Sequence, residues 1–131
     1  MKKYKGWFVV LMITLSLFGV TACYDNGDNS YEQITPEQAK TIMVTENEYI
    51  IIDARTTEEF AEGHIKDAIL IPEYEIANRA EKELPDKNVL ILVYCRSGRR
   101  SKIASEELVK LGYTNVKEFG GIIDWPYEVV K

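Results

Sequence analysis

The sequence predicts an α/β fold with a mostly parallel central sheet and helices on both of its faces. Residues 49–53 and 89–94 are apolar runs that do not alternate with polar positions. Strands that are buried on both faces have this pattern. Amphipathic segments typical of helices lie between the predicted strands, so that strands and helices alternate along the chain. This order favours parallel strands joined by helical crossovers.

Local signals place the elements of the first half of this domain. Thr35 is followed by a proline and by Gln38, which is the pattern of a capping box at the start of a helix. Thr57 can cap a second, short helix, and Gly63 ends it. The predicted order is a helix over 36–44, a strand over 49–53, a helix over 58–62 and a strand over 68–71.

The second half continues the same alternation. Ile103, Ala104, Leu108 and Leu111 would share one face of an amphipathic helix, and Gly112 would end it. A Pro-Asp pair separates the preceding helix from the second buried strand. The predicted order is a helix over 76–84, a strand over 89–94, a helix over 101–111, a strand over 116–119 and a short helix over 122–125.

The first 22 residues have the layout of a secretory signal rather than of a folded domain. Lys2, Lys3 and Lys5 form a positive start, and residues 6–20 are almost entirely apolar. This apolar stretch is shorter than the roughly 20 residues that a membrane-spanning helix needs. We therefore expect the domain to be exported.

The residue that follows this signal indicates an anchor. Cys23 comes directly after Val-Thr-Ala, and the four residues resemble the bacterial lipobox, in which the cysteine is lipidated and becomes the new N-terminus. We expect a signal over 1–22, a flexible tether over 23–30 and one domain over 31–131, held at the extracytoplasmic face of the cell membrane. An ordinary signal peptide with an incidental cysteine, or an uncleaved anchor, are the alternatives.

The charge of the chain argues against a nucleic-acid partner. The formal net charge is −5, and the signal contains lysines but no acidic residue, so the exported part is more acidic still. Nucleic-acid binding is usually accompanied by a basic stripe. No group of residues has metal-ligand spacing, and no Gly-rich nucleotide loop is present. We expect no metal and no cofactor, and we expect a monomer.

A basic loop after the second buried strand is the strongest indication of chemistry. It reads Cys-Arg-Ser-Gly-Arg-Arg-Ser over residues 95–101, between the end of the strand and the start of a helix. Sites in parallel sheets form at such strand ends. Loop amides, a helix N-terminus at Ser101 and nearby arginines would all stabilise a thiolate, and Gly98 allows a tight turn. The candidate site residues are Cys95, Arg96, Ser97, Gly98, Arg99, Arg100 and Ser101.

Cysteine usage supports a chemical role for Cys95. If Cys23 carries lipid, Cys95 has no intramolecular disulfide partner. An unpaired thiol outside the cytoplasm is open to oxidation, so its presence favours use over packing. A buried structural cysteine is the alternative. Asp53 stands at the end of the first buried strand, and with Arg55 it is a candidate supporting residue.

Three separated blocks together resemble a rhodanese domain. The first contains Asp-Ala-Arg over 53–55, Glu-Phe over 59–60 and Gly-His-Ile over 63–65. The second is the loop over 95–101, and the third is Gly-Gly-Ile-Ile-Asp-Trp over 120–125. The resemblance covers residues 31–131 and implies a rhodanese-like fold.

The resemblance also implies a single-domain thiosulfate sulfurtransferase. Cys95 would accept a sulfane sulfur from thiosulfate or a similar anion and would pass it from a persulfide to a thiol or cyanide, with ping-pong kinetics. Loop amides would bind the anion, with Arg96 and Arg100 as the candidates for direct contact. His64 would have a structural role in its turn. Asp53 and Arg55 would form ion pairs that hold the strand end, with Glu59 as a candidate partner of Arg55.

Two other functions stay open on the sequence. The first is a sulfur-carrying or redox-sensing module that uses Cys95 without useful turnover. The second is a phosphatase or arsenate reductase, which in related folds carries Cys-x5-Arg. The sequence has Cys-x4-Arg, because Ser101 occupies the position where the longer motif requires arginine. The shorter loop favours sulfur as the group that is transferred.

Overall fold

The computed structural model describes residues 30–131. The predicted signal, the lipidation site at Cys23 and the tether up to residue 29 lie outside the described residues. No helix within residues 30–131 has both the length and the apolar composition that a bilayer crossing needs.

Five parallel strands form one sheet in the order β1-β5-β4-β2-β3, which confirms the predicted α/β fold. The central strand is β4, the one that ends at the predicted nucleophile. The strands are β1 (Glu32–Gln33), β2 (Ile50–Asp53), β3 (Ile69–Leu70), β4 (Ile91–Cys95) and β5 (Val116–Gly121). The helices are α1 (Pro36–Thr45), α2 (Thr57–Glu62), η1 (Glu73–Glu75), α3 (Ile76–Glu83), α4 (Arg99–Lys110) and η2 (Ile122–Asp124).

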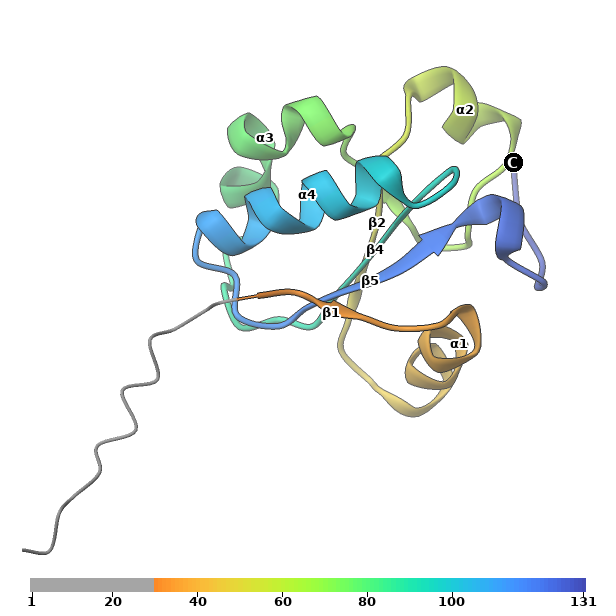
Figure 1. Ribbon diagram of the computed structural model, residues 1–131, viewed down its shortest axis with the longest axis horizontal. Helices are drawn as coiled ribbons and strands as arrows, with labels where there is room; N and C mark the ends of the chain where they lie inside the picture. Colours follow the sequence, from red (N-terminus) through yellow and green to blue (C-terminus); the bar gives the residue numbers. More distant parts are fainter. Residues whose placement is uncertain (1–29) are drawn as a thin grey trace, which may run out of the picture.

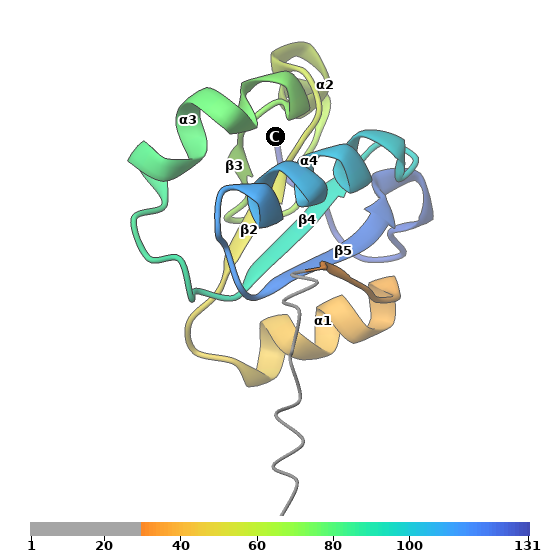
Figure 2. The ribbon, with the colours of Figure 1, turned by 60° about the vertical axis from the view of Figure 1, so that its left-hand side comes forward.

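Helices cover both faces of the sheet, as Figure 1 and Figure 2 show, with α3 and α4 on one side and α1 on the other. Each residue of β4 is buried, and successive residues belong to opposite cores. Ile91, Val93 and Cys95 pack with residues of α3 and α4, whereas Leu92 and Tyr94 pack with Ala39 of α1 and its neighbours. The two-sided burial explains why this strand is apolar throughout.

The structure agrees with three of the predicted helix starts, at residues 36, 76 and 122, and corrects two. Thr35 and Gln38 form the predicted capping box of α1. Thr56, not Thr57, caps α2, because the carboxylate of Glu59 stands at the position from which it can bond back to the cap. Helix α4 begins at Arg99 rather than at residue 101, because Gly98 completes the turn with φ 105° and lets the helix start at once.

Strand β1 and the full length of β5 were not predicted. Strand β1 has only two residues, both polar and exposed, so the sequence offers no apolar pattern there. Strand β5 continues through the two glycines at its end, and Gly121 pairs with Cys95 after a register shift in the β4–β5 ladder. The end of β5 therefore lies against the predicted catalytic loop.

Gly121 permits a close approach between β5 and the loop backbone. A Cβ atom at this position would lie 2.0 Å from the carbonyl oxygen of Arg96 and 2.5 Å from the Cα atom of Ser97. Next to it, the N–H of Ile123 donates to the same Arg96 carbonyl at 3.2 Å. Any side chain at position 121 would have to push the loop away from the sheet.

We predict that Gly121→Ala destabilises the domain and displaces the loop. Overpacking costs about 1–3 kcal/mol, which would lower Tm by roughly 4 °C or more in a domain of this size. Because the loop carries Cys95, its rate of alkylation by iodoacetamide should change as well. Thermal unfolding and alkylation of the purified protein measure the two effects.

Gly112→Ala is the control, because Gly112 has a positive φ of 96°, unlike Gly121 with φ −123°, and a Cβ there would meet nothing within 4 Å. That variant should lose stability through backbone strain alone and keep the wild-type alkylation rate. A Gly121→Ala protein with unchanged Tm and unchanged alkylation would contradict the close approach.

Candidate functional site

Cys95 is the last residue of β4, and its sulfur lies beneath the turn that leads into α4. The residue is 1% exposed, and its thiol is free. The backbone N–H of Gly98 donates to Sγ at 3.0 Å, and the thiol donates to Oγ of Ser101 at 3.3 Å. The N–H at the start of α4 thus points at the sulfur, which is an arrangement that stabilises a thiolate, whereas the Ser101 oxygen accepts the thiol hydrogen.

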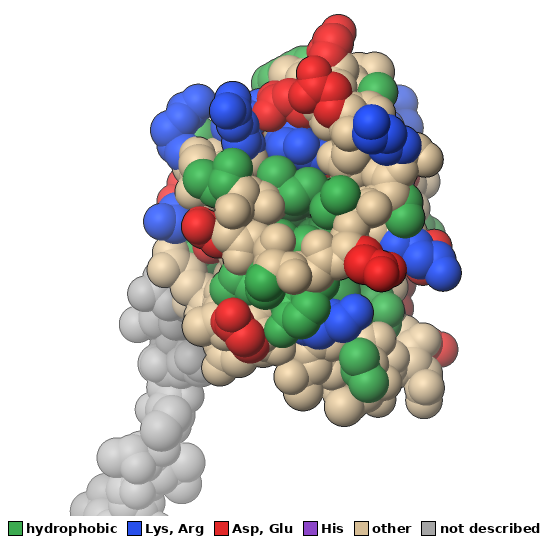
Figure 3. Space-filling view, turned by 90° about the vertical axis from the view of Figure 1, so that its right-hand side faces the viewer, with side chains coloured by type: hydrophobic (Ala, Val, Ile, Leu, Met, Phe, Trp, Pro, Cys, Tyr) green, Lys and Arg blue, Asp and Glu red, His purple; other side chains and the backbone are tan. Residues whose placement is uncertain are grey.

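The loop presents basic side chains to solvent above this buried sulfur. Arg96, Ser97 and Arg99 are exposed, whereas Gly98 is buried. Figure 3 views the side of the molecule on which the loop and the C-terminal segment lie in Figure 1, and Lys and Arg side chains gather near its upper edge beside acidic ones. An anion can therefore meet the guanidinium groups before it reaches the thiol.

Arg100 differs from the other loop arginines because Glu59 holds it. Nη1 and Nη2 of Arg100 donate to the two carboxylate oxygens of Glu59 at 2.6 and 2.9 Å. The hydrogen bonds from Arg100 are the main reason why the pKa of Glu59 falls to about 2. The ion pair joins α2 to α4. Glu59 had been expected as a partner of Arg55, and that expectation is wrong.

Asp53 and Arg55 pair with each other at the end of β2, in agreement with the expectation that they form ion pairs. Nη2 of Arg55 lies 2.7 Å from Oδ2 of Asp53 and also donates to the carbonyl of Gly63 at 2.6 Å. The hydroxyl of Tyr94 donates to Asp53 Oδ2 at 2.7 Å and accepts the N–H of Ile65 at 3.1 Å. Burial raises the pKa of Tyr94, so its hydroxyl stays protonated and can donate. This network ties β2 and β4 to the turn after α2.

His64 makes its contacts in that turn and in the C-terminal segment. Its ring stacks on Phe60 with centroids 3.7 Å apart, and Nδ1 lies 3.0 Å from the Phe60 carbonyl oxygen. Its backbone forms an isolated bridge with Val130. These contacts support the structural role that was expected for His64.

Glu118 is part of the site, although sequence reasoning missed it. It lies in β5, is 3% exposed and accepts the hydroxyl of the fully buried Ser101 at 2.6 Å. The sequence contained a signal for it, because strand periodicity places Glu118 on the same face as Val116, which is buried. A carboxylate on an inward-facing position of a strand is unusual. Glu118 does not contact the Cys95 sulfur directly, because Ser101 lies between them and forms hydrogen bonds with both.

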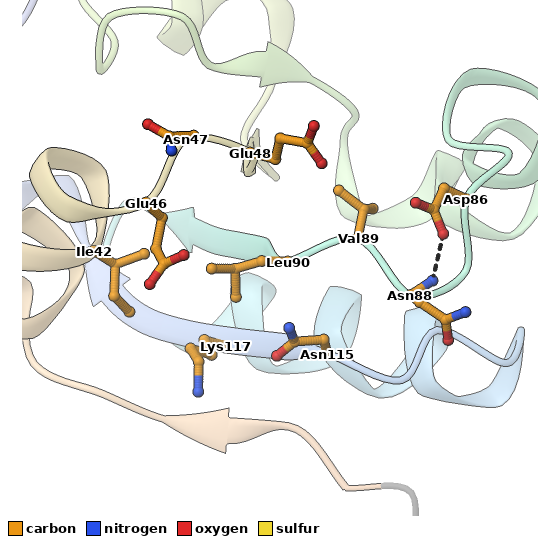
Figure 4. A pocket seen from close by; sticks show the side chains of 10 residues that line it. All are labelled: Ile42, Glu46, Asn47, Glu48, Asp86, Asn88, Val89, Leu90, Asn115 and Lys117. Atoms are coloured by element: carbon orange, nitrogen blue, oxygen red, sulfur yellow. Dashed lines mark hydrogen bonds between the residues drawn. The ribbon is translucent and has the colours of Figure 1, made fainter.

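The opposite edge of the sheet has a hollow of different character. The hollow lies near the amino ends of the strands, and its volume is about 670 Å3. Figure 4 shows the side chains that line it, which include Glu46, Glu48, Asp86 and Lys117. Its lining contains no cysteine, serine, threonine or histidine, and sites in parallel sheets form at the other edge. Among residues 30–131, no group of three His, Cys, Asp or Glu side chains could hold a metal ion.

The pH dependence of stability should reveal the Glu59–Arg100 pair. Because the pKa of Glu59 in the folded state is about 2, below its ordinary 4.5, the pair stabilises the fold fully above about pH 4.5 and is lost as the pH falls toward 2. We predict that Glu59→Gln costs about 1 kcal/mol at pH 7 and that this cost disappears at the acidic end. Urea unfolding at several pH values measures it.

Glu58→Gln is the control for this prediction. Glu58 is the exposed neighbour of Glu59 on α2, and no ion pair involves it within the described part of the chain. Its substitution should leave stability unchanged at every pH. An equal effect of both variants would mean that helix charge, rather than the pair with Arg100, causes the loss.

Comparison with known proteins agrees with this geometry. The model of the rhodanese-like domain matches residues 35–126. Thiosulfate sulfurtransferase PspE of Escherichia coli is 41% identical over 80 residues, which are 61% of this chain and 77% of that protein. A protein named sulfurtransferase from Allochromatium vinosum is 36% identical over 94 residues, with 71% and 86% of the two chains covered.

A solved structure is similar as well. The structure described as rhodanese with anions from E. coli has a TM-score of 0.60 and 40% sequence identity, and the match covers 63% of this chain and 98% of that one. The family model, the sequence relatives and the fold thus agree. The chain belongs to the rhodanese-like domain family, in which the relatives described above are named as sulfurtransferases and as a rhodanese.

Proposed function

We propose that this protein transfers a sulfane sulfur from thiosulfate, or from a similar anion, to a thiol or cyanide acceptor through a persulfide on Cys95. The observation that carries the proposal is the position of Cys95 Sγ under the first turn of α4, 3.0 Å from the N–H of Gly98, at the carboxyl end of the central strand. The relatives named thiosulfate sulfurtransferase and the related structure that contains anions support it.

The first half-reaction loads the sulfur. The Cys95 thiolate attacks the outer sulfur of thiosulfate, the sulfur–sulfur bond of the donor breaks, and sulfite leaves with the electron pair. The product is a Cys95 persulfide whose outer sulfur carries the negative charge. The N–H of Gly98 and the N-terminus of α4 stabilise negative charge on the cysteine sulfur before the attack.

The second half-reaction unloads it. A cyanide ion or an acceptor thiolate attacks the outer sulfur of the persulfide, the bond to Cys95 breaks, and thiocyanate or an acceptor persulfide leaves. The electron pair of the broken bond returns to Cys95 as a thiolate. One nucleophile that serves two successive substrates gives ping-pong kinetics.

The loop arginines would have separate tasks. Arg96 and Arg99 are exposed and free to meet the donor anion, because a guanidinium forms charge-assisted hydrogen bonds with oxyanions. Arg100 is engaged by Glu59, so it holds α2 beside the loop instead of offering its whole fork to the donor. This changes the sequence-based proposal, in which Arg96 and Arg100 made the direct contacts.

The burial of Cys95 favours one second candidate, a module that carries sulfur or responds to oxidants without rapid turnover. A residue that is 1% exposed must be uncovered by a shift of the loop before a donor can reach its sulfur. Both functions share the persulfide and differ in the speed of unloading. Steady-state turnover with thiosulfate and cyanide separates them, since a carrier loads one equivalent and then reacts slowly.

Mass spectrometry tests the persulfide directly. The purified protein should gain about 32 Da after incubation with thiosulfate, the mass of one added sulfur, and cyanide should remove the gain as thiocyanate. Cys95→Ser should gain nothing, because the oxygen is a far weaker nucleophile for sulfur. A folded wild-type protein with a free thiol and no adduct would overturn thiosulfate as the donor.

The exposed arginines should determine the affinity for the donor. We predict that Arg96→Ala and Arg99→Ala each raise the KM for thiosulfate roughly tenfold or more, since each removes a charge-assisted hydrogen bond worth about 1.5–3 kcal/mol. The kcat should change less. Lys102→Ala, at an exposed position of α4, is the control for general loss of positive charge. Equal effects at all three positions would indicate attraction by overall charge instead of contact.

A further inference from the structure

Glu118 places a carboxylate in the protein interior, where no ion pair among residues 30–131 compensates for its burial. It is 3% exposed, and within the described residues no Lys or Arg lies within ion-pair distance of it. Burying a carboxylate is costly unless hydrogen bonds or a cation compensate for the lost water. Its Oε1 accepts only neutral donors, the Ser101 hydroxyl at 2.6 Å and the N–H of Gly120 at 2.9 Å.

Two hydrogen bonds link Cys95 to Glu118 through Ser101, and both are donated in the same direction, from the thiol toward the carboxylate. The Ser101 hydroxyl has one hydrogen, and its acceptors are Glu118 Oε1 at 2.6 Å, the Gly98 carbonyl at 3.0 Å and the Gly120 carbonyl at 3.4 Å. The carboxylate is both the nearest and the charged acceptor, so it takes the hydrogen. The Ser101 oxygen then accepts the Cys95 thiol at 3.3 Å. The Cys95 thiol, the Ser101 hydroxyl and the Glu118 carboxylate thus form a chain of hydrogen bonds along which a proton can be transferred.

We propose that Glu118 receives the Cys95 proton through Ser101 when the thiolate forms. The S–H bond breaks as its proton passes to Ser101 Oγ, and the hydrogen already on Ser101 passes to Glu118 Oε1. Ser101 ends as a neutral hydroxyl, and the negative charge moves from the carboxylate to the sulfur. When Cys95 becomes a resting thiol again, the same steps run backwards.

The charges around Cys95 explain why a relay is useful. If the thiol proton were lost to water while Glu118 stayed ionised, two negative charges would face each other across Ser101. Moving the proton to Glu118 leaves one. Arg100, in the first turn of α4, is already held in an ion pair by Glu59 of α2. The other loop arginines, Arg96 and Arg99, are exposed, so that solvent screens their charges, and within the described residues no cation forms an ion pair with Glu118.

Glu118 acts through Ser101 and touches neither the sulfur nor a substrate, so it is a positioning residue for the proton. This inference rests on the proposed function only in its purpose, the supply of a thiolate for sulfur transfer. It adds a proton acceptor to a site in which amides, the helix N-terminus and arginines had been the sole expected sources of activation.

The test compares the alkylation of Cys95 in Glu118→Gln and in the wild type, from about pH 5 to about pH 9.5, a range that includes the ordinary ionisation of a thiol. The full chain reacts with iodoacetamide, and mass spectrometry follows the Cys95 peptide, because the chain also contains Cys23. Glutamine keeps the oxygen that accepts from Ser101 and Gly120 but cannot take a proton. Glu106→Gln, at an exposed position of α4, is the matched control.

The relay predicts that Glu118→Gln slows alkylation at about pH 6.5 by roughly tenfold or more and leaves the rate at the alkaline end unchanged, where hydroxide removes the proton. The Glu106→Gln rate should equal that of the wild type. Faster alkylation at every pH would mean that Glu118 only repels the thiolate. A change of less than about twofold would mean that it only packs. Either result would overturn the proposal.

Ser101→Ala provides a second test, which also applies if Glu118→Gln does not fold. It keeps the carboxylate but removes the link, so it should show the same loss at about pH 6.5, and the double variant should be no slower than either single one. An additive double variant would contradict a shared relay. Because alkylation needs no sulfur donor, failure of the relay is distinct from failure of the persulfide assay.

Discussion

The contact between the end of β5 and the backbone after Cys95 is the constraint on which the site depends. Gly121 pairs with Cys95, and the absence of its side chain lets the Arg96 carbonyl come so close that a Cβ would lie 2.0 Å away. The loop is thereby pressed onto the sheet, and Gly98 at φ 105° turns its N–H toward the sulfur before α4 begins. A looser contact would leave the thiol without its donor.

Around this contact the charges are distributed by function. The arginines that face solvent can attract an anion, and the arginine at the end of the motif is fixed by Glu59 and braces α2. Asp53, Arg55 and Tyr94 hold the ends of the two central strands together under the turn. Glu118 stands apart, since its buried carboxylate reaches the sulfur only through a hydroxyl. Paired charges thus stabilise the structure, whereas the buried carboxylate of Glu118, which has no ion-pair partner among the described residues, is separated from the Cys95 sulfur by one hydroxyl.

Much of the fold could be predicted because it rests on local pattern. The two apolar strands, the capping box at Thr35 and the order of helices and strands follow from nearest neighbours along the chain. The cap of α2 and the start of α4 were misplaced by one and two residues, since the true boundaries depend on the reach of Glu59 and on the φ of Gly98. Strand β1 was not predicted, because its two polar residues show no hydrophobic pattern. Export and lipidation at Cys23 stay predictions.

The sequence by itself determined the place of Cys95 at a strand end, the basic loop after it and the sheet edge at which they lie, because a strand end, a glycine and a helix start are local features. Only the tertiary structure decided which charges meet. Arg55 binds Asp53 rather than Glu59, Arg100 binds Glu59, and Glu118 reaches Ser101 across 17 positions of the chain. Such pairings depend on how strands and helices pack side by side. The separation of two residues along the chain does not predict that packing.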